Sequence, residues 1–174
     1  MYLTPPSLQF EDSWNAAIVE FEAEDAHGFW NIPEKPRDCA SYIKTAQDHS
    51  NGKNLPEYWV PATTYWLIDK DKFVGHVNIR HALSDKLKMV GGNIGYAIRP
   101  SERKKGYGTE ILRLALEKAH EIGLERVMVT CADDNVGSVK IIEKNGGVLD
   151  NAYEWDEGVA GPFHGIVRRY WVEL

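Results

Sequence analysis

The part of the chain best suited to chemistry is a basic loop between a strand-like run and a helix. The run Asn93–Arg99 breaks at Pro100, and three consecutive basic residues and two glycines follow before the helix. Gly106 and Gly108 leave out side chains that would hold an anion away from the backbone. A helix N-terminus presents unpaired N–H groups and the positive end of the helix dipole, so the loop predicts a site for a pyrophosphate.

The helix that follows the loop is amphipathic and fixes the direction of these N–H groups. Its apolar residues recur at helical spacing, at Ile111, Leu112, Leu114, Ala115, Leu116, Ala119 and Ile122. We therefore expect the amides of residues 106–109 to face outward. The residues expected to bind the anion are Arg103, Lys104, Lys105, Gly106, Tyr107, Gly108 and Thr109.

The spacing Arg103-x-x-Gly106-x-Gly108 differs from the dinucleotide fingerprint and lacks the Gly-Lys-Ser/Thr ending of a nucleotide-triphosphate loop. It resembles the acetyl-CoA-binding motif of the GNAT superfamily of N-acetyltransferases, Arg/Gln-x-x-Gly-x-Gly/Ala between a strand and a helix. Taken by itself, the motif is also compatible with an ordinary strand-to-helix turn.

A second motif downstream strengthens the resemblance. A buried strand over Arg126–Cys131 is followed by a short helix over Val136–Lys144, and the superfamily has Asn-x-x-Ser/Ala-x-x-x-Tyr-x-x-x-Gly-Phe in this place. Asn135, Ser138 and Gly146 fall on matching positions. An Asn before a helix is equally a good N-cap, and the roles of cap and cofactor ligand are compatible. The resemblance covers about residues 65–174, most closely 93–147, and within the superfamily it points to a group of bacterial predicted acetyltransferases.

The resemblance implies an α/β acyl-CoA N-acyltransferase fold, a mixed and mostly antiparallel sheet with helices on both faces and a central strand splay that holds acetyl-CoA. We expect one domain over residues 1–174, since 43% hydrophobic content with six Trp and eight Tyr can fill a core. The periodicity predicts helices and strands in the following order: helices over 7–22 and 39–48, a hairpin of 63–69 and 73–80, strands over 93–99 and 126–131, and a last antiparallel pair of 147–154 and 167–173.

For catalysis, the resemblance implies that the amides of Tyr96 and Ile98 on the splayed strand bind the pantetheine arm and polarise the thioester carbonyl. Histone-type members carry a Glu base on this strand, where this chain has Gly92. Many members carry a Tyr acid where this chain has Ile142. Ser138 is the remaining hydroxyl, and ribosomal-protein N-terminal acetyltransferases of the superfamily are thought to use a Ser there as the acid; the alternative is a small helix residue packed beside the cofactor.

Two residues are candidates for the base that deprotonates the acceptor. His81 follows the strand over 73–80 and has a suitable ordinary pKa, and Glu154 near the end of the next-to-last strand is its rival. Either could instead be a surface residue.

The insertion Trp155–Gly165 between the last two strands is a candidate border of the acceptor site. Trp155 and Phe163, with Asp156 and Glu157, could form an aromatic and acidic wall for an amine. A solvent-exposed loop explains the same composition.

Composition narrows the class of partner. A net charge of −6 and a pI near 5.5 argue against nucleic acid as a partner and suit a cationic acceptor.

Cys39 and Cys131 are isolated, which predicts reduced cysteines and no metal site. With no apolar run of membrane-spanning length and no signal peptide, we expect a cytoplasmic protein without membrane partners. Dimers are common in the superfamily, so a homodimer is compatible with the sequence.

The function implied is transfer of an acetyl group from acetyl-CoA to a primary amine by direct attack. The amine could belong to a small molecule, a peptide N-terminus or a lysine. Because the Glu and the Tyr are absent, a non-catalytic acyl-CoA-binding module is one alternative. A nucleotide-binding regulatory domain is another, and it would bind ATP or NAD more tightly than CoA.

Overall fold

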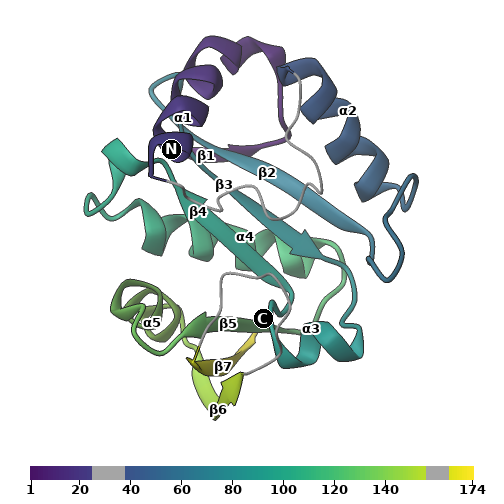
Figure 1. The fold of residues 1–174 in the computed structure, drawn as a ribbon, viewed down its shortest axis with the longest axis vertical. Coiled ribbons are helices and arrows are strands. Elements are labelled where there is room, and N and C mark those ends of the chain that lie inside the picture. The colour runs from purple at the N-terminus through teal and green to yellow at the C-terminus, as the bar shows by residue number, and fades with distance from the viewer. Residues whose placement is uncertain (25–37, 156–164) are drawn as a thin grey trace.

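The computed structural model describes residues 1–24, 38–155 and 165–174. The strands, α-helices and 3-10 helices (η) of these parts are shown in Figure 1. In chain order they are β1 (Tyr2–Thr4), η1 (Leu8–Phe10), α1 (Glu11–Ala23), α2 (Cys39–Ser50), β2 (Ala62–Asp69), β3 (Lys72–Arg80), α3 (Asp85–Met89), β4 (Ile94–Ile98), η2 (Pro100–Glu102), α4 (Tyr107–Glu121), β5 (Arg126–Ala132), α5 (Val136–Lys144), β6 (Val148–Trp155) and β7 (Gly165–Glu173).

The strands form two antiparallel sheets that meet between β4 and β5. One sheet has the order β1-β2-β3-β4 and the other the order β5-β7-β6, so β4 and β5 do not share a ladder. Figure 1 shows the two strands facing each other across the middle of the molecule. The central splay expected between the strands is confirmed by this arrangement.

Helices cover both faces of the four-stranded sheet. Neighbouring residues of a strand point to opposite faces, so they pack against different helices. On β2, Leu67 packs into the same buried cluster as Ile111, Leu112 and Ala115 of α4. The adjacent Trp66 lies in a second buried cluster with side chains of α1 and α2. The amphipathic pattern therefore identified the buried face of α4, except for Ile122, which is the C-cap and is 40% exposed.

Three features of the structure differ from the sequence expectation. The helix expected over residues 7–22 is divided: Ser7 caps the short η1, and α1 begins at Glu11. Neither β1 nor α3 was predicted, since three and five residues are too few for periodicity to be seen.

None of the helices in the described parts of the chain is long and apolar enough to cross a membrane.

Candidate active site

The open edge of β4 faces the gap between the two sheets. Arg80 N donates to Asn93 O at 2.7 Å and Arg99 N donates to Val74 O at 2.9 Å, which fixes the residues of β4 that pair with β3. Hydrogen-bonding direction alternates along an antiparallel pair. The backbone groups of Tyr96 and Ile98 consequently point away from β3 and into the gap, as expected from the sequence.

Asn93 closes the gap at the beginning of β4. Its backbone N donates to Met128 O at 2.7 Å, and its side-chain Oδ1 accepts from Met128 N at 2.9 Å. Gly91 N adds a bond to Thr130 Oγ1 at 2.9 Å. These three bonds join β5 to the start of β4, so the two strands separate only after Asn93.

Gly92 has a structural reason for replacing the Glu of histone-type members. Its φ is +61°, and a Cβ would lie 2.4 Å from Met128 O and 3.3 Å from Val129 Cα. The site where those members carry a base is therefore occupied by the backbone of β5.

The cofactor loop ends in a helix start with amides left for a ligand. Gly106 is the N-cap of α4 in a left-handed conformation (φ +90°), and nothing lies within 4 Å of the place of its Cβ in the described residues. Within the same residues, the amides of Tyr107 and Gly108 have no hydrogen-bond partner. The expectation that the amide of Thr109 also faces outward is wrong, because it donates to Gly106 O at 3.1 Å.

Gly108 serves helix packing. A Cβ there would lie 2.5 Å from Ile141 Cδ1 of α5. Asn145 Nδ2 donates to Thr109 O at 3.1 Å and to Ile141 O at 2.8 Å, so the two helices are also joined by hydrogen bonds. Any side chain at Gly108 would therefore act on the α4–α5 contact before it reached a phosphate.

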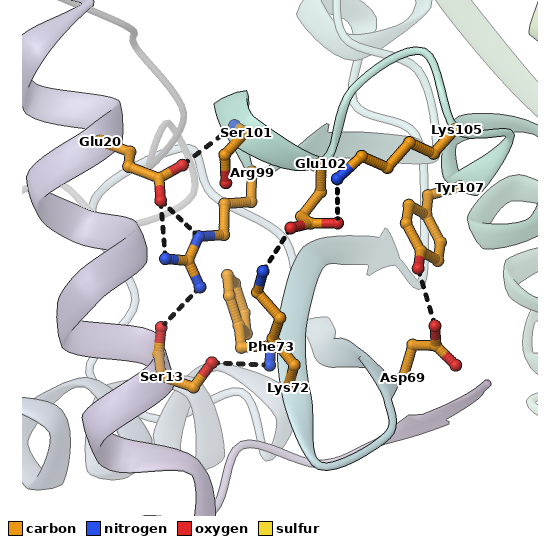
Figure 2. A network of polar contacts seen from close by, with 10 residues as sticks. All are labelled: Ser13, Glu20, Asp69, Lys72, Phe73, Arg99, Ser101, Glu102, Lys105 and Tyr107. Atoms are coloured by element: carbon orange, nitrogen blue, oxygen red, sulfur yellow. Dashed lines mark hydrogen bonds and ion pairs between the residues drawn. The ribbon is translucent and has the colours of Figure 1, made fainter.

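Two basic residues of the loop have acidic partners. Arg103 Nη1 binds Glu24 Oε2 of the α1 end at 2.6 Å, and its Nε donates to Ile98 O at 3.2 Å. Lys105 and Lys72 both bind the carboxylate of Glu102, which is only 6% exposed (Figure 2). Lys72 and Lys105 together keep the pKa of Glu102 below its ordinary value, despite the opposing effect of burial. Lys104 is exposed.

A second ion pair fixes the base of the loop to α1. Arg99 donates through Nε to Glu20 Oε1 at 2.8 Å, and Ser101 N donates to Glu20 Oε2 at 3.0 Å (Figure 2). Burial raises the pKa of Glu20, but the hydrogen bonds from Arg99 and Ser101 outweigh it and lower the pKa to about 2. Since Arg99 is 8% exposed, this pair is well shielded from solvent.

Replacing Glu20 by glutamine should destabilise the protein by about 1–2 kcal/mol at neutral pH, because it leaves the guanidinium of Arg99 without its counter-ion. The pKa of Glu20 is lower in the folded state than its ordinary value of 4.5, so its contribution is complete above that value and is lost as the pH falls toward 2. Thermal unfolding of wild type and Glu20→Gln from pH 7 to pH 3 should show the two curves converging. A constant difference over this range would contradict the assignment.

At the other side of the gap, α5 brings several predicted residues together. Asn135 Oδ1 accepts from Ser138 N at 3.0 Å, so the N-cap interpretation of Asn135 is confirmed. The hydroxyl of Tyr96 is buried next to the Ser138 side chain without a hydrogen bond of ordinary geometry. Burial raises the pKa of Tyr96, and Ser138 opposes this in part. Ile142, where many superfamily members carry a Tyr, is fully buried in the core.

The two candidate bases lie elsewhere. His81 Nε2 is 2.8 Å from Thr63 Oγ1, which is 2.9 Å from Ser50 Oγ, so the imidazole is directed toward β2 and away from the gap. Burial lowers the pKa of His81. Glu154 is exposed on β6, which β7 separates from β5. The structure thus brings neither residue to Ser138.

Of the four residues expected to border the acceptor site, only Trp155 lies within the described residues. Trp155 ends β6, whereas Asp156, Glu157 and Phe163 lie outside the described residues. Among the residues that the structure describes, no group of three or more His, Cys, Asp or Glu could hold a metal ion. Cys39 and Cys131 are both buried as free thiols.

The phenol of Tyr96 escaped the sequence analysis, which considered only its backbone. Its neighbour Ser138 lies on α5, far along the chain from β4. The useful signal would have been the alternation of β4, which puts Ile94, Tyr96 and Ile98 on the face that packs against α4.

Comparison with known proteins agrees with this geometry. A family model described as an acetyltransferase (GNAT) domain matches residues 8–148. YnaD of Bacillus subtilis (strain 168), an uncharacterized N-acetyltransferase, is 28% identical over 143 residues, which cover 80% of this chain and 75% of that protein. The chain therefore belongs to the GNAT acetyltransferase family, and it is an acetyl-CoA-dependent N-acetyltransferase.

Solved structures share the fold at low sequence identity. The microcin C7 self-immunity acetyltransferase MccE, in complex with acetyl-CoA and AMP, has a TM-score of 0.70 at 18% identity and covers 99% of this chain and 91% of its own. RimL, a ribosomal L7/L12 alpha-N-protein acetyltransferase in complex with coenzyme A, has a TM-score of 0.70 at 15% identity, with 99% and 93% covered.

Proposed function

We propose that the protein transfers the acetyl group of acetyl-CoA to a primary amine by direct attack at the β4–β5 gap. The observation that carries this proposal is a line of backbone donors, first on the open edge of β4 and then at the start of α4. The amides of Tyr96 and Ile98 face the gap, and the amides of Tyr107 and Gly108 lie at the helix start beyond it. This line suits a long ligand with a carbonyl at one end and a pyrophosphate at the other.

The residues around the gap supply what the chemistry needs. As the amine nitrogen forms its bond to the acetyl carbon, negative charge develops on the carbonyl oxygen, where the Tyr96 amide donates. The bond from carbon to sulfur then breaks, and the departing thiolate takes a proton from the Ser138 hydroxyl beside the Tyr96 phenol. The amine loses its proton to water, and the Ser138 oxygen regains a proton from water, which restores its hydroxyl.

Calorimetric titration with acetyl-CoA, followed by measurement of CoA release with a panel of primary amines, tests the function. Binding together with amine-dependent release supports the proposal. Binding without release from any amine would favour an acyl-CoA-binding module. Tighter binding of ATP or NAD than of acetyl-CoA would favour a nucleotide-binding domain.

Variants that lack the hydroxyl of Ser138 or of Tyr96 distinguish general acid catalysis by Ser138 from a role in packing alone. Ser138→Ala should lower kcat about tenfold or more while acetyl-CoA affinity changes little, because general acid catalysis contributes to the transition state alone. Tyr96→Phe keeps the ring and should give a smaller loss of the same kind. A Ser138→Ala enzyme with unchanged kcat would exclude the acid role.

A further inference from the structure

A buried carboxylate lies in the loop that is expected to bind the pyrophosphate. Glu102 ends η2 and is 6% exposed, whereas the three basic residues that follow it are exposed. A carboxylate repels a phosphate and is costly to bury. Its charge alone therefore gives no reason for an acid in this place, and the reason has to lie in the contacts that Glu102 makes.

Glu102 joins two lysines that come from different parts of the chain. Its Oε2 accepts from Lys105 Nζ in the loop at 2.9 Å, and its Oε1 accepts from Lys72 Nζ at the beginning of β3 (Figure 2). The side chains of Lys72 and Lys105 are 45% and 53% exposed, so the buried part of this bridge is the carboxylate. Because a buried charge that loses a partner is left uncompensated, the carboxylate holds both ammonium groups more firmly than a surface ion pair would.

The turn between β2 and β3 contacts the loop a second time. Tyr107 Oη at the start of α4 donates to Asp69 Oδ2 at the end of β2, at 2.7 Å (Figure 2). The turn thus binds Glu102 before the N-cap of α4 and Tyr107 after it. The short segment between these two contacts is held at both ends, and Lys105 lies within it.

The backbone around Lys105 depends on such contacts. Lys104 (φ +62°) and Gly106 (φ +90°) on either side of it are both in the left-handed region. This conformation is unfavourable for a residue with a Cβ such as Lys104, so it persists only where the surroundings fix it. The ammonium of Lys105 has three N–H donors, and Glu102 is its only acceptor within the described residues. Two donors remain for phosphate oxygens beside the unpaired amides of α4.

We propose that Glu102 is a positioning residue for the cofactor, which holds the ammonium of Lys105 where it binds the pyrophosphate of acetyl-CoA. This inference rests on the binding of acetyl-CoA by this loop, which is part of the proposed function. A lysine that is free in solution loses rotamer freedom when it binds a phosphate, and a lysine already held by a carboxylate loses less. Glu102 acts through Lys105 and does not touch the ligand.

The sign of a substitution distinguishes positioning from charge. If Glu102 acted through its charge alone, Glu102→Gln would strengthen the binding of an anion. Positioning predicts the opposite, and we expect the Kd for acetyl-CoA to rise about five- to tenfold. Glu24→Gln is the matched control, because it removes an equal charge from the exposed pair with Arg103 and should not raise the Kd. Calorimetric titration measures both, and an unchanged or lower Kd in folded Glu102→Gln would overturn the inference.

A double-mutant cycle shows whether Glu102 acts through Lys105. Lys105→Met removes the ammonium and should raise the Kd for acetyl-CoA about tenfold. Once Lys105 is methionine, Glu102→Gln has nothing left to position and should change the Kd by less than about twofold. Equal effects of Glu102→Gln in the two backgrounds would show that Glu102 does not act through Lys105.

A shortened donor separates positioning from damage to the fold. S-acetylpantetheine carries the thioester but lacks the pyrophosphate, so its transfer does not use the loop. In Glu102→Gln, kcat/KM for acetyl-CoA should fall about five- to tenfold with kcat unchanged, while kcat/KM for S-acetylpantetheine stays as in the wild type. Equal losses with the two donors would contradict the positioning role. Failure of the wild type to release CoA with any amine would instead overturn the proposed function and leave the comparison of Kd values valid.

Discussion

Replacing Arg103 by glutamine is expected to weaken acetyl-CoA binding about ten- to a hundredfold. A charge-assisted hydrogen bond to a phosphate contributes about 1.5–3 kcal/mol. The side chain of Arg103 lies at the beginning of the cofactor loop, where its Nε donates to Ile98 O at the end of β4. Calorimetric titration of the purified variant with acetyl-CoA measures the effect directly.

The ion pair with Glu24 supplies a control of opposite sign. Arg103 Nη1 binds Glu24 Oε2 at 2.6 Å, and both side chains are more than 40% exposed, so breaking this pair changes stability little. Glu24→Gln breaks the same pair but leaves the guanidinium available to the cofactor. Acetyl-CoA binding to Glu24→Gln should be unchanged or tighter. If both variants lost affinity to the same extent, the pair itself, and not a cofactor contact, would be the role of Arg103.

The order of the large elements could be predicted from the sequence because each has a clear period. The helix that begins at Tyr107 repeats apolar residues at helical spacing, and the strand over Arg126–Ala132 has a continuous buried run at residues 127–131. The anion-binding loop was found by its two glycines and its charges. These are local signals, which a sequence carries directly.

The interior of the site depends on register and on long-range pairing, which the sequence does not carry. His81 was chosen for its ordinary pKa, but its partner is Thr63 of β2, eighteen residues earlier. Asn78 was not singled out, because one polar residue in a strand normally predicts a solvent face. Its burial and its unused Oδ1 are visible only in the assembled fold.

Glycine positions illustrate the same limit. The sequence assigned Gly108 to the phosphate and treated Gly92 as a missing base. In the structure both are sites of close packing, Gly108 against Ile141 and Gly92 against Met128. A glycine in a sequence indicates that a side chain is absent, but the group that takes its place is known only from the structure.

Introducing a glutamate base at Gly92 should therefore destabilise the folded protein. Gly92→Glu, and Gly92→Ala as the smaller change, should each destabilise the fold by about 3 kcal/mol or more, because a φ of +61° costs about 1–2 kcal/mol for a residue with a Cβ and the overlap with Met128 O adds about 1–3 kcal/mol. In a chain of 174 residues this corresponds to a fall in Tm of about 10 °C, measured by thermal unfolding.

Gly123 separates the two contributions. Its φ is +89°, and nothing in the described residues lies within 4 Å of the place of its Cβ, so Gly123→Ala reports the conformational cost alone. The additional loss in Gly92→Ala measures the contact with β5. Equal losses in the two variants would show that β5 moves away without cost. A stable Gly92→Glu with raised kcat would show that the strand accommodates the base of histone-type members. We expect the additional loss, because Asn93 holds the backbone of β4 against Met128 with two hydrogen bonds immediately beside Gly92.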